Sequence, residues 1–419
     1  MDAPITNKVR NLPIKLMLSF LIFTEVLLFI APQNWHINNY EVVILFFVIV
    51  NIALYLGYKK GVKSLKANLS TKQLNLKIVK SVIIFSIPAM MFQIYSSFGT
   101  LSLVSVANTV RVGLTDAGDA YFSRGGGGEG GGVNMLYFMI NSLLSPLLYC
   151  CFALGAYFYK KLDKRSRIIL VGLIVLELSR WFAVGVRKGI MDMIIIISSS
   201  YVAGNSYIIN NKVLFNKIKL GAIVVLSLFV AYFLISNLSR NAQDSFVDAA
   251  IDFNVTGFYR QLPTAMVYPL YAICSYLCQG YYALAKALEV GFIYPNLLST
   301  NFFTINVAER FGLNPIDGSY LDILYNRFNI DPFINWHSIY VWLANGFTFW
   351  GVPIFIYLVG YMFGKTWIQS VRGNSIVAIP LFAILTQMIF YFFANNQIFS
   401  FSFPVIFILL FLYYIRIRV

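Results

Sequence analysis

Charged residues are scarce in this sequence. Only 12% of the 419 residues are Asp, Glu, Lys or Arg, whereas 59% are hydrophobic and the mean hydropathy is +0.72. A water-soluble domain of this length cannot bury such a large apolar fraction in one core. The composition therefore excludes a soluble globular protein and favours a chain that lies largely within a membrane.

Histidine and cysteine are also rare, with two and four residues. Cys150 and Cys151 are adjacent in one apolar run, and Cys274 and Cys278 are one helical turn apart, which is a poor geometry for a disulfide. Two histidines are too few for a typical zinc site, and no run of acidic residues suits magnesium and pyrophosphate. We therefore expect no cofactor and no metal requirement.

Long apolar runs divide the chain, and most are long enough to cross a bilayer as helices. The first run is too long for a removable signal peptide, and no small-residue cleavage site follows it. The sequence predicts a single all-α polytopic membrane domain over 1–419, with no soluble domain attached. The ten predicted transmembrane helices lie at about 13–31, 40–58, 79–100, 133–158, 168–186, 189–205, 219–237, 338–363, 375–394 and 397–415.

Lysine and arginine placement predicts the orientation of these helices. If the N-terminus lies inside, ten spans return the C-terminus to the inside, and about two thirds of the 32 basic residues fall on the inner face. Two large loops, 101–132 and 238–337, then lie outside, and we expect them to contain amphipathic helices. The net charge of +15 thus reflects membrane topology, and we do not interpret it as nucleic-acid binding.

The basic residues of the outer side are mostly arginine. Lysine suffices for topology, whereas a guanidinium can bind phosphate or carboxylate with two parallel hydrogen bonds. An anionic ligand at the outer face is one interpretation, and pairing with outer aspartates is the alternative for about half of these arginines. The outer basic set is Arg111, Arg124, Arg180, Arg187, Arg240, Arg260, Arg310, Arg327, Lys188 and Lys286.

The stretch "WFAVGVRKGIMDM" places Arg187 and Lys188 in a turn with almost no loop between two apolar runs. Charges at membrane depth usually face the bundle interior or a watery cavity. The alternative is that Glu177–Arg180 and Lys188–Asp192 are neutralising pairs within helices. These pairs would account for Arg180 and Lys188 but not for Arg187.

The two outer loops differ in composition. The first ends in "SRGGGGEGGGVN", and we interpret Gly125–Gly132 as a flexible tether or lid, with disorder as the alternative. The second contains Tyr259–Glu289, which is apolar but interrupted by polar residues, and we expect an amphipathic segment resting at the outer interface. Tyrosines there can anchor at the interface or stack on sugar rings, and Tyr268, Tyr271 and Tyr276 are the candidates.

His337 lies where the second loop meets the eighth predicted helix, in "NWHSIYVWLANGFTFWGVPIF". A histidine at a helix start near the membrane surface can act as a general base. The alternative is a residue that caps or packs the helix.

The chain resembles the bacterial O-antigen polymerase (Wzy-type) family, with kinship to the O-antigen ligases. The resemblance rests on the large outer loop before the last three helices, on "GVRKGI" at Gly185–Ile190, and on "WHSIYVWLANGFTFWG" at Trp336–Gly351. The first motif is similar to a Gly-x-Arg turn of such polymerases. The second is similar to the start of a late helix in the ligases.

The resemblance implies a metal-independent glycosyltransferase with a GT-C-like fold, in the bacterial inner membrane, whose active site faces the periplasm. Its substrates would be oligosaccharide repeat units linked to undecaprenyl diphosphate, and a chain-length regulator is a further implied partner. Arg187 and His337 would be catalytic, as diphosphate ligand and general base. Diphosphate or sugar would be bound by Arg180, Lys188, Arg240, Arg260, Arg327 and the tyrosines Tyr268, Tyr271 and Tyr276.

Two rival functions remain open. An O-antigen ligase would use the same donor but transfer the glycan to lipid A-core. A lipid-linked oligosaccharide flippase or other transporter would show inverted repeats and broken helices at mid-membrane. We find no internal repeat in the sequence.

Overall fold

A computed structural model describes residues 5–64, 75–115, 120, 135–241, 255–332, 335–394 and 403–418. Within these ranges the chain is helical, and the only β-type pairing is an isolated bridge between Gln33 and Val255. The predicted all-α class is therefore confirmed for the described part of the chain. The glycine-rich segment Gly125–Gly132 lies outside the described residues.

The first seven predicted spans all coincide with helices. The first predicted outer loop, 101–132, contains the helix α4. The helices of this part of the chain are α1 (Asn7–Ile30), α2 (Tyr40–Lys63), α3 (Leu76–Phe98), α4 (Leu103–Thr115), α6 (Met135–Phe158), α7 (Lys164–Val184), α8 (Arg187–Gly204), α9 (Tyr207–Asn210) and α10 (Lys212–Asn241), with the 3-10 turn η1 (Tyr159–Lys161) between α6 and α7.

The remaining three predicted spans also coincide with helices. The described part of the second predicted loop is mostly helical as well, from η2 to α13. The elements are η2 (Gly257–Gln261), α11 (Thr264–Glu289), η3 (Leu297–Thr300), α12 (Phe302–Arg310), α13 (Tyr320–Phe328), α14 (Ile339–Arg372), α15 (Ala378–Phe390) and α16 (Phe403–Arg418).

Six helices are long and apolar enough to cross a membrane. They include α1, α2, α3, α10 and α14, together with most of α6. Charged residues exclude α7 and α8 from this set, and the apolar parts of α15 and α16 are shorter. The described chain is thus a multi-pass helical membrane protein with six candidate spans, where the sequence predicted ten.

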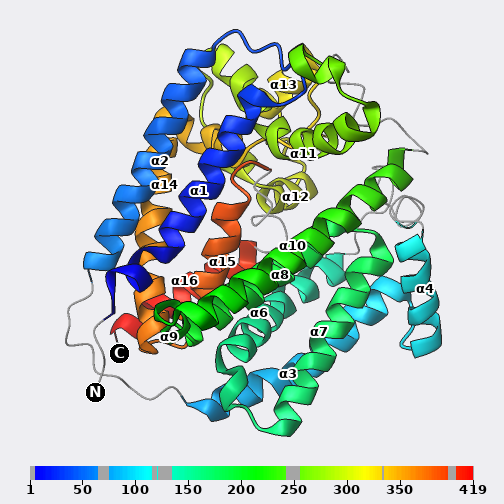
Figure 1. Ribbon diagram of the computed structural model, residues 1–419, viewed down its shortest axis with the longest axis vertical. Coiled ribbons are helices and arrows are strands. Elements are labelled where there is room, and N and C mark those ends of the chain that lie inside the picture. Colours follow the sequence, from blue (N-terminus) through cyan, green and yellow to red (C-terminus); the bar gives the residue numbers. More distant parts are fainter. Residues whose placement is uncertain are drawn as a thin grey trace.

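Figure 1 shows the start of α1 and the end of α16 toward one end of the molecule, and α11 and α13 toward the other. At the first end, the Thr6 hydroxyl donates to Asn210 Oδ1 at 2.9 Å, and Trp367 Nε1 donates to the Val9 carbonyl at 3.0 Å. The segments that the charge pattern assigned to the inner face therefore lie together.

Helices α2 and α14 run parallel and approach at four glycines. A Cβ atom on Gly57 or Gly61 would lie 2.0 Å from the carbonyl oxygen of Tyr357 or Tyr361. Gly360 and Gly364 of α14 approach the α2 backbone almost as closely. Small residues spaced four apart let helix backbones pack in a membrane, where no hydrophobic effect drives association.

Helix α14 is interrupted near its start. Thr348 has φ +59° and ψ 166°, which is not helical, and a β-branched residue rarely adopts this region. The segment Ile339–Asn345 before the break is buried, and the segment after the break packs against α2. The eighth predicted helix is therefore two helical segments joined at Thr348.

Helix α11 corrects the expectation of a segment resting on the membrane surface. Cys278, Tyr281 and Leu284 are fully buried, and α11 packs against α1, α2, α13 and α14. A Cβ atom on Gly280 would lie 2.0 Å from the Phe393 carbonyl oxygen. The segment is helical as predicted, but it belongs to the core because tertiary neighbours cover both its faces.

Candidate functional site

The turn between α7 and α8 is as tight as the sequence predicted. Gly185 ends α7 with φ +68°, a left-handed conformation that glycine adopts without steric cost. Its N–H donates to the Phe182 carbonyl at 3.0 Å, and the Val186 N–H donates to the Trp181 carbonyl at 3.2 Å. Helix α8 then begins at Arg187.

Both intrahelical pairs proposed from the sequence are present. Arg180 Nη2 lies 2.7 Å from Glu177 Oε1, and Lys188 Nζ lies 2.7 Å from Asp192 Oδ2. Trp181 Nε1 also donates to Glu177 Oε1 at 2.8 Å, and the Arg180 guanidinium lies 4.1 Å from the centre of the Trp181 ring. The Glu177 carboxylate thus fixes both an arginine and an indole.

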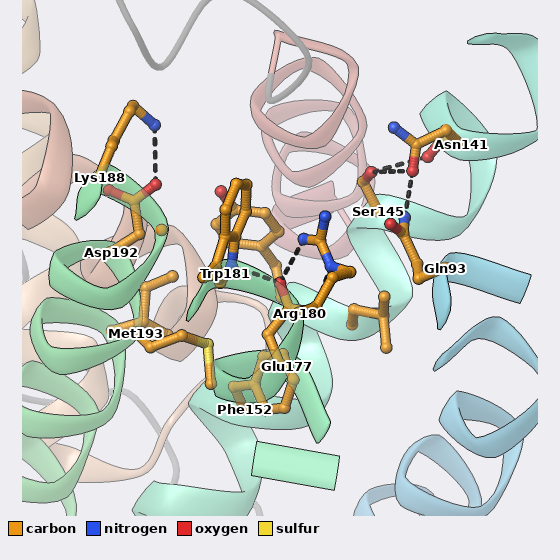
Figure 2. A pocket seen from close by; sticks show the side chains of 14 residues that line it. Gln93, Asn141, Ser145, Phe152, Glu177, Arg180, Trp181, Lys188, Asp192 and Met193 are labelled. Carbon is orange, nitrogen blue, oxygen red and sulfur yellow. Dashed lines mark hydrogen bonds and ion pairs between the residues drawn. The ribbon is translucent and has the colours of Figure 1, made fainter. Parts of the chain in front are cut away.

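These side chains line a polar cavity of about 220 Å³. Figure 2 shows Lys188 and Asp192 on one side, Arg180, Trp181 and Glu177 in the middle, and Gln93 with Asn141 on the other side. Helices α3, α6, α7 and α8 contribute these residues. The full lining is Gln93, Asn141, Ser145, Leu148, Tyr149, Phe152, Glu177, Arg180, Trp181, Lys188, Gly189, Asp192, Met193 and Ile196.

Gly189 leaves room for the Trp181 indole because it has no side chain. A Cβ atom at this position would lie 1.9 Å from Trp181 Cδ2. The second glycine of "GVRKGI" therefore has a packing role, because any side chain there would displace the indole that Glu177 holds.

Arg187 lies on a second, apolar cavity of about 250 Å³. The arginine is only 6% exposed, and its guanidinium carbon lies 4.7 Å from the centre of the Phe233 ring. Helices α1, α8, α10 and α11 form this cavity together with the end of α15 and the residues after it. The full lining is Phe20, Phe23, Arg187, Lys188, Met191, Leu226, Phe229, Val230, Phe233, Ile273, Tyr276, Leu277, Phe390, Tyr391 and Phe393.

Lys188 lines both cavities. Its ammonium lies 5.5 Å from the centre of the Tyr391 ring, and Tyr276 closes the apolar cavity through edge contacts with Phe233 and Trp336. Four of the ten predicted site residues, namely Arg180, Arg187, Lys188 and Tyr276, are therefore brought together.

The other predicted arginines are placed elsewhere or have side chains outside the described residues. Arg260 is exposed, and its Nε donates to the Val255 carbonyl at 2.5 Å. Arg327 is exposed on α13. Neither lines one of the two cavities. Arg240 lies in the last turn of α10, and its side chain lies outside the described residues.

The remaining predicted tyrosines do not line these cavities either. Tyr271 is buried, and its carbonyl accepts a hydrogen bond from Gln33 Nε2 at 2.6 Å. Tyr268 is half-buried in the first turns of α11. Both belong to the contact between α11 and the rest of the bundle.

His337 does not fit the role of a general base. Its side chain is fully buried, and its Nε2 lies 3.3 Å from the Ile330 carbonyl oxygen. Burial lowers its pKa from 6.5 to about 3, so the imidazole stays neutral at physiological pH. The packing alternative therefore describes the position of His337 in this structure.

The residues that α3, α6 and the end of α15 bring to the site were not predicted from the sequence. Gln93 donates to Asn141 across the contact between α3 and α6. Polar residues in the middle of apolar runs usually face the bundle interior, so these two carried a usable signal. Tyr391 could not be recognised from the sequence, because tyrosines occur throughout the chain.

The described residues contain no group of three or more His, Cys, Asp or Glu side chains arranged to hold a metal ion. In comparisons with known proteins, no family model, curated protein or solved structure matches this chain. The geometry of the two cavities is therefore the basis for any functional conclusion beyond membrane character.

Proposed function

We propose that this protein is a membrane glycosyltransferase of the O-antigen polymerase type, which joins oligosaccharide repeat units carried on undecaprenyl diphosphate. The motifs "GVRKGI" and "WHSIYVWLANGFTFWG" support the family. The observation that carries the proposal is the position of two cations at the start of α8: Arg187 lines the apolar cavity, and Lys188 lines both the apolar and the polar cavity.

The two cavities suit the two ends of one amphiphilic molecule. Among the described residues, the apolar cavity is lined by aliphatic and aromatic side chains and by the two cations Arg187 and Lys188. A lipid tail would bury apolar surface there, and a phosphate next to it would meet both cations. The polar cavity begins at Lys188 and offers amide, hydroxyl and carboxylate groups to a sugar.

The position of the cations within α8 supports an anionic ligand. Arg187 and Lys188 are the first two residues of the helix, where the macrodipole disfavours positive charge. Backbone N–H groups at a helix start also favour an anion. A diphosphate at this point would contact both cations and the helix terminus.

The chemistry is glycosyl transfer with diphosphate as the leaving group. A hydroxyl of the acceptor unit attacks the anomeric carbon of the donor, and negative charge grows on the departing diphosphate. Donors placed where this charge develops lower the barrier, and losing one such donor typically costs about 10²–10³-fold in rate. Arg187 is the residue we place in this role, with Lys188 beside it.

The proposal includes the finer membrane assignment. The chain would cross the bacterial inner membrane ten times with both termini inside and the Arg187 site toward the periplasm. The charge pattern supports this orientation. Membrane lipids, the lipid-linked glycans and a chain-length regulator would be its partners.

The test is complementation of a deletion strain with wild-type protein, Arg187→Ala, Arg187→Lys and the control Arg165→Ala. Arg165 is exposed at the opposite end of α7. We expect long glycan chains with wild-type and Arg165→Ala, at least about a hundred-fold less polymer with Arg187→Ala, and partial activity with Arg187→Lys, because lysine lacks the planar fork.

Gel analysis of lipopolysaccharide from the deletion strain distinguishes a polymerase from a ligase and from a flippase. Lipopolysaccharide that carries core plus one repeat unit supports a polymerase. Bare core supports a ligase instead, and complete absence of surface glycan points to a flippase. Full polymer length in Arg187→Ala, at normal protein level, would remove Arg187 from the reaction.

A further inference from the structure

Two carboxylates line the polar cavity, and they differ in how their oxygens are used. Glu177 Oε1 accepts hydrogen bonds from Arg180 Nη2 at 2.7 Å and Trp181 Nε1 at 2.8 Å, and Oε2 accepts one from Arg180 Nε at 3.0 Å. Both oxygens are therefore occupied. Glu177 holds its neighbours in position and has little capacity left for a ligand.

Asp192 is arranged differently. Its Oδ2 accepts a hydrogen bond from Lys188 Nζ at 2.7 Å, whereas Oδ1 is buried and has no partner with hydrogen-bond geometry among the described residues, although the Tyr391 hydroxyl lies near the carboxylate. The residue is only 7% exposed. A buried carboxylate oxygen without a donor is costly, and such atoms call for a ligand or a catalytic explanation.

The cavity lies where a sugar hydroxyl could provide that donor. Asp192 and Lys188 both line the polar cavity, and Lys188 also lines the apolar cavity beside Arg187. Along α8, Asp192 is five residues from Arg187, which corresponds to about 7.5 Å along the helix axis. In a direct displacement the anomeric carbon lies between the leaving diphosphate oxygen and the attacking hydroxyl, and Lys188, which lines both cavities, lies between the Arg187 side and the Asp192 side.

We infer that Asp192, and not His337, is the general base that accepts the proton of the acceptor hydroxyl. This inference rests on the proposed function. The acceptor oxygen forms a bond to the anomeric carbon of the donor, while the bond from that carbon to the phosphate oxygen breaks. The proton passes to Asp192 Oδ1, and the electron pair leaves with the diphosphate beside Arg187 and Lys188.

Lys188 has two roles in the proposed reaction. Its ion pair orients the Asp192 carboxylate, and its position on both cavities places it near the leaving group. Tyr391 lies beside the Asp192 carboxylate, and its hydroxyl donates to the Lys188 carbonyl at 3.5 Å. Because the hydroxyl attacks the anomeric carbon directly, the reaction inverts the configuration at that carbon.

The test compares wild-type, Asp192→Asn, Asp192→Glu and the exposed control Glu309→Gln, each purified and placed in lipid vesicles. The probe is the undecaprenyl-diphosphate-linked repeat unit, with donor binding and polymer formation measured separately. An asparagine keeps the shape and can accept from Lys188, but it cannot take a proton. We expect Asp192→Asn to bind donor within about three-fold of wild-type while its rate falls at least about a hundred-fold.

The other variants complete the test. Asp192→Glu retains a carboxylate and should recover about ten-fold or more over Asp192→Asn, and Glu309→Gln should match wild-type. The new linkage made by wild-type protein should have the anomeric configuration opposite to that of the donor, as read from its proton coupling constant. If Asp192→Asn fails to fold, a folded Asp192→Glu that polymerises within about ten-fold of wild-type supports the assignment, and retention of configuration in the wild-type linkage overturns it.

Several outcomes would overturn the assignment. These are polymerisation by folded Asp192→Asn near the wild-type rate, a glutamate variant no better than the asparagine variant, or retention of configuration. Such results would leave the proposed function standing. If wild-type protein binds the donor but makes no glycosidic bond, the proposed function fails, and this inference fails with it.

Discussion

Two helix pairs in this protein use glycine at their contacts for opposite purposes. In the parallel α2–α14 pair, glycine brings backbones together and leaves no space. In the antiparallel α7–α8 pair, Gly185 makes the turn and Gly189 makes room for the Trp181 ring. Residues of this second pair line the polar and the apolar cavity, and charged side chains are among them.

The two helix pairs therefore have different roles: the α2–α14 pair contributes close packing, and the α7–α8 pair contributes the charged residues of the candidate site. The α2–α14 contact supplies dispersion contacts through close backbone approach, which is the main source of helix association in a membrane. The α7–α8 pair keeps Glu177, Arg180, Arg187, Lys188 and Asp192 within or beside the bundle, which is costly unless each charge has a use. The close-packed α2–α14 pair stabilises the bundle, so the α7–α8 pair can accommodate charged side chains and cavities.

The largest effect should come from filling the α2–α14 contact. In Gly61→Leu the new side chain would begin 2.0 Å from the Tyr361 carbonyl oxygen, so the helices must separate. We expect a stability loss at or above the usual overpacking cost of about 1–3 kcal/mol, with little folded protein in detergent.

The matched control for Gly61→Leu is Gly221→Leu in α10, because a Cβ atom on Gly221 would meet no atom within 4 Å. Size-exclusion chromatography and thermal unfolding measure both variants. Equal stability of the two would show that the glycine contact does not hold the bundle together.

A smaller effect, confined to activity, should follow from Gly189→Ala. Its methyl group would lie 1.9 Å from Trp181 Cδ2, so the indole must move and weaken its hydrogen bond to Glu177. We expect polymer formation to fall by about ten-fold, equivalent to about 1.4 kcal/mol, while the melting temperature changes little. Gly172→Ala in α7, where a Cβ atom meets nothing within 4 Å, is the control.

Stability should also depend on pH through His337. Its folded-state pKa of about 3 lies below the unfolded value of 6.5, so on acidification the unfolded chain binds the proton first. Stability is therefore complete above about pH 6.5 and declines toward pH 3, by up to roughly 1.4 kcal/mol per pH unit. Thermal unfolding between about pH 7 and pH 5 should show this decline in wild-type protein.

His337→Gln removes this titration and should flatten the pH dependence of stability in the same range. His36→Gln is the control, because His36 is the other histidine and is exposed. If polymer formation in His337→Gln, once folded, shows a changed pH profile of the catalytic rate, His337 takes part in the reaction after all.

The smallest effect should be seen at Arg260 and Arg327. The sequence grouped both with the diphosphate ligands, whereas the structure places them on the exposed surface away from both cavities. We expect Arg260→Ala and Arg327→Ala to polymerise within about two-fold of wild-type, since exposed contacts are worth roughly 0–1 kcal/mol. A hundred-fold loss at either residue would extend the site beyond the two cavities.

Much of the fold could be predicted from local sequence. Apolar runs located ten helices, and Gly185 followed by two cations located the α7–α8 turn. Amphipathic helices were expected in the second outer loop, but only the first of them, within Tyr259–Glu289, was located from the sequence. Its apolar residues are interspersed with polar ones, and only the neighbouring helices decide which of them are buried.

The candidate site could be predicted from the sequence only where it depends on spacing within one helix. The pairs Glu177–Arg180 and Lys188–Asp192 follow from spacing within one helix, and both are present. The contributions of Gln93, Asn141 and Tyr391 depend on contacts between segments far apart in the chain.

The sequence by itself determined the membrane character, the helix positions and the short-range charge pairs, because hydropathy and helical spacing act locally. Tertiary structure alone decided that Arg187 meets an apolar cavity, that one carboxylate oxygen of Asp192 has no partner with hydrogen-bond geometry among the described residues, and that His337 is buried. Burial and cavity shape are properties of packed neighbours, and a single helix does not encode them.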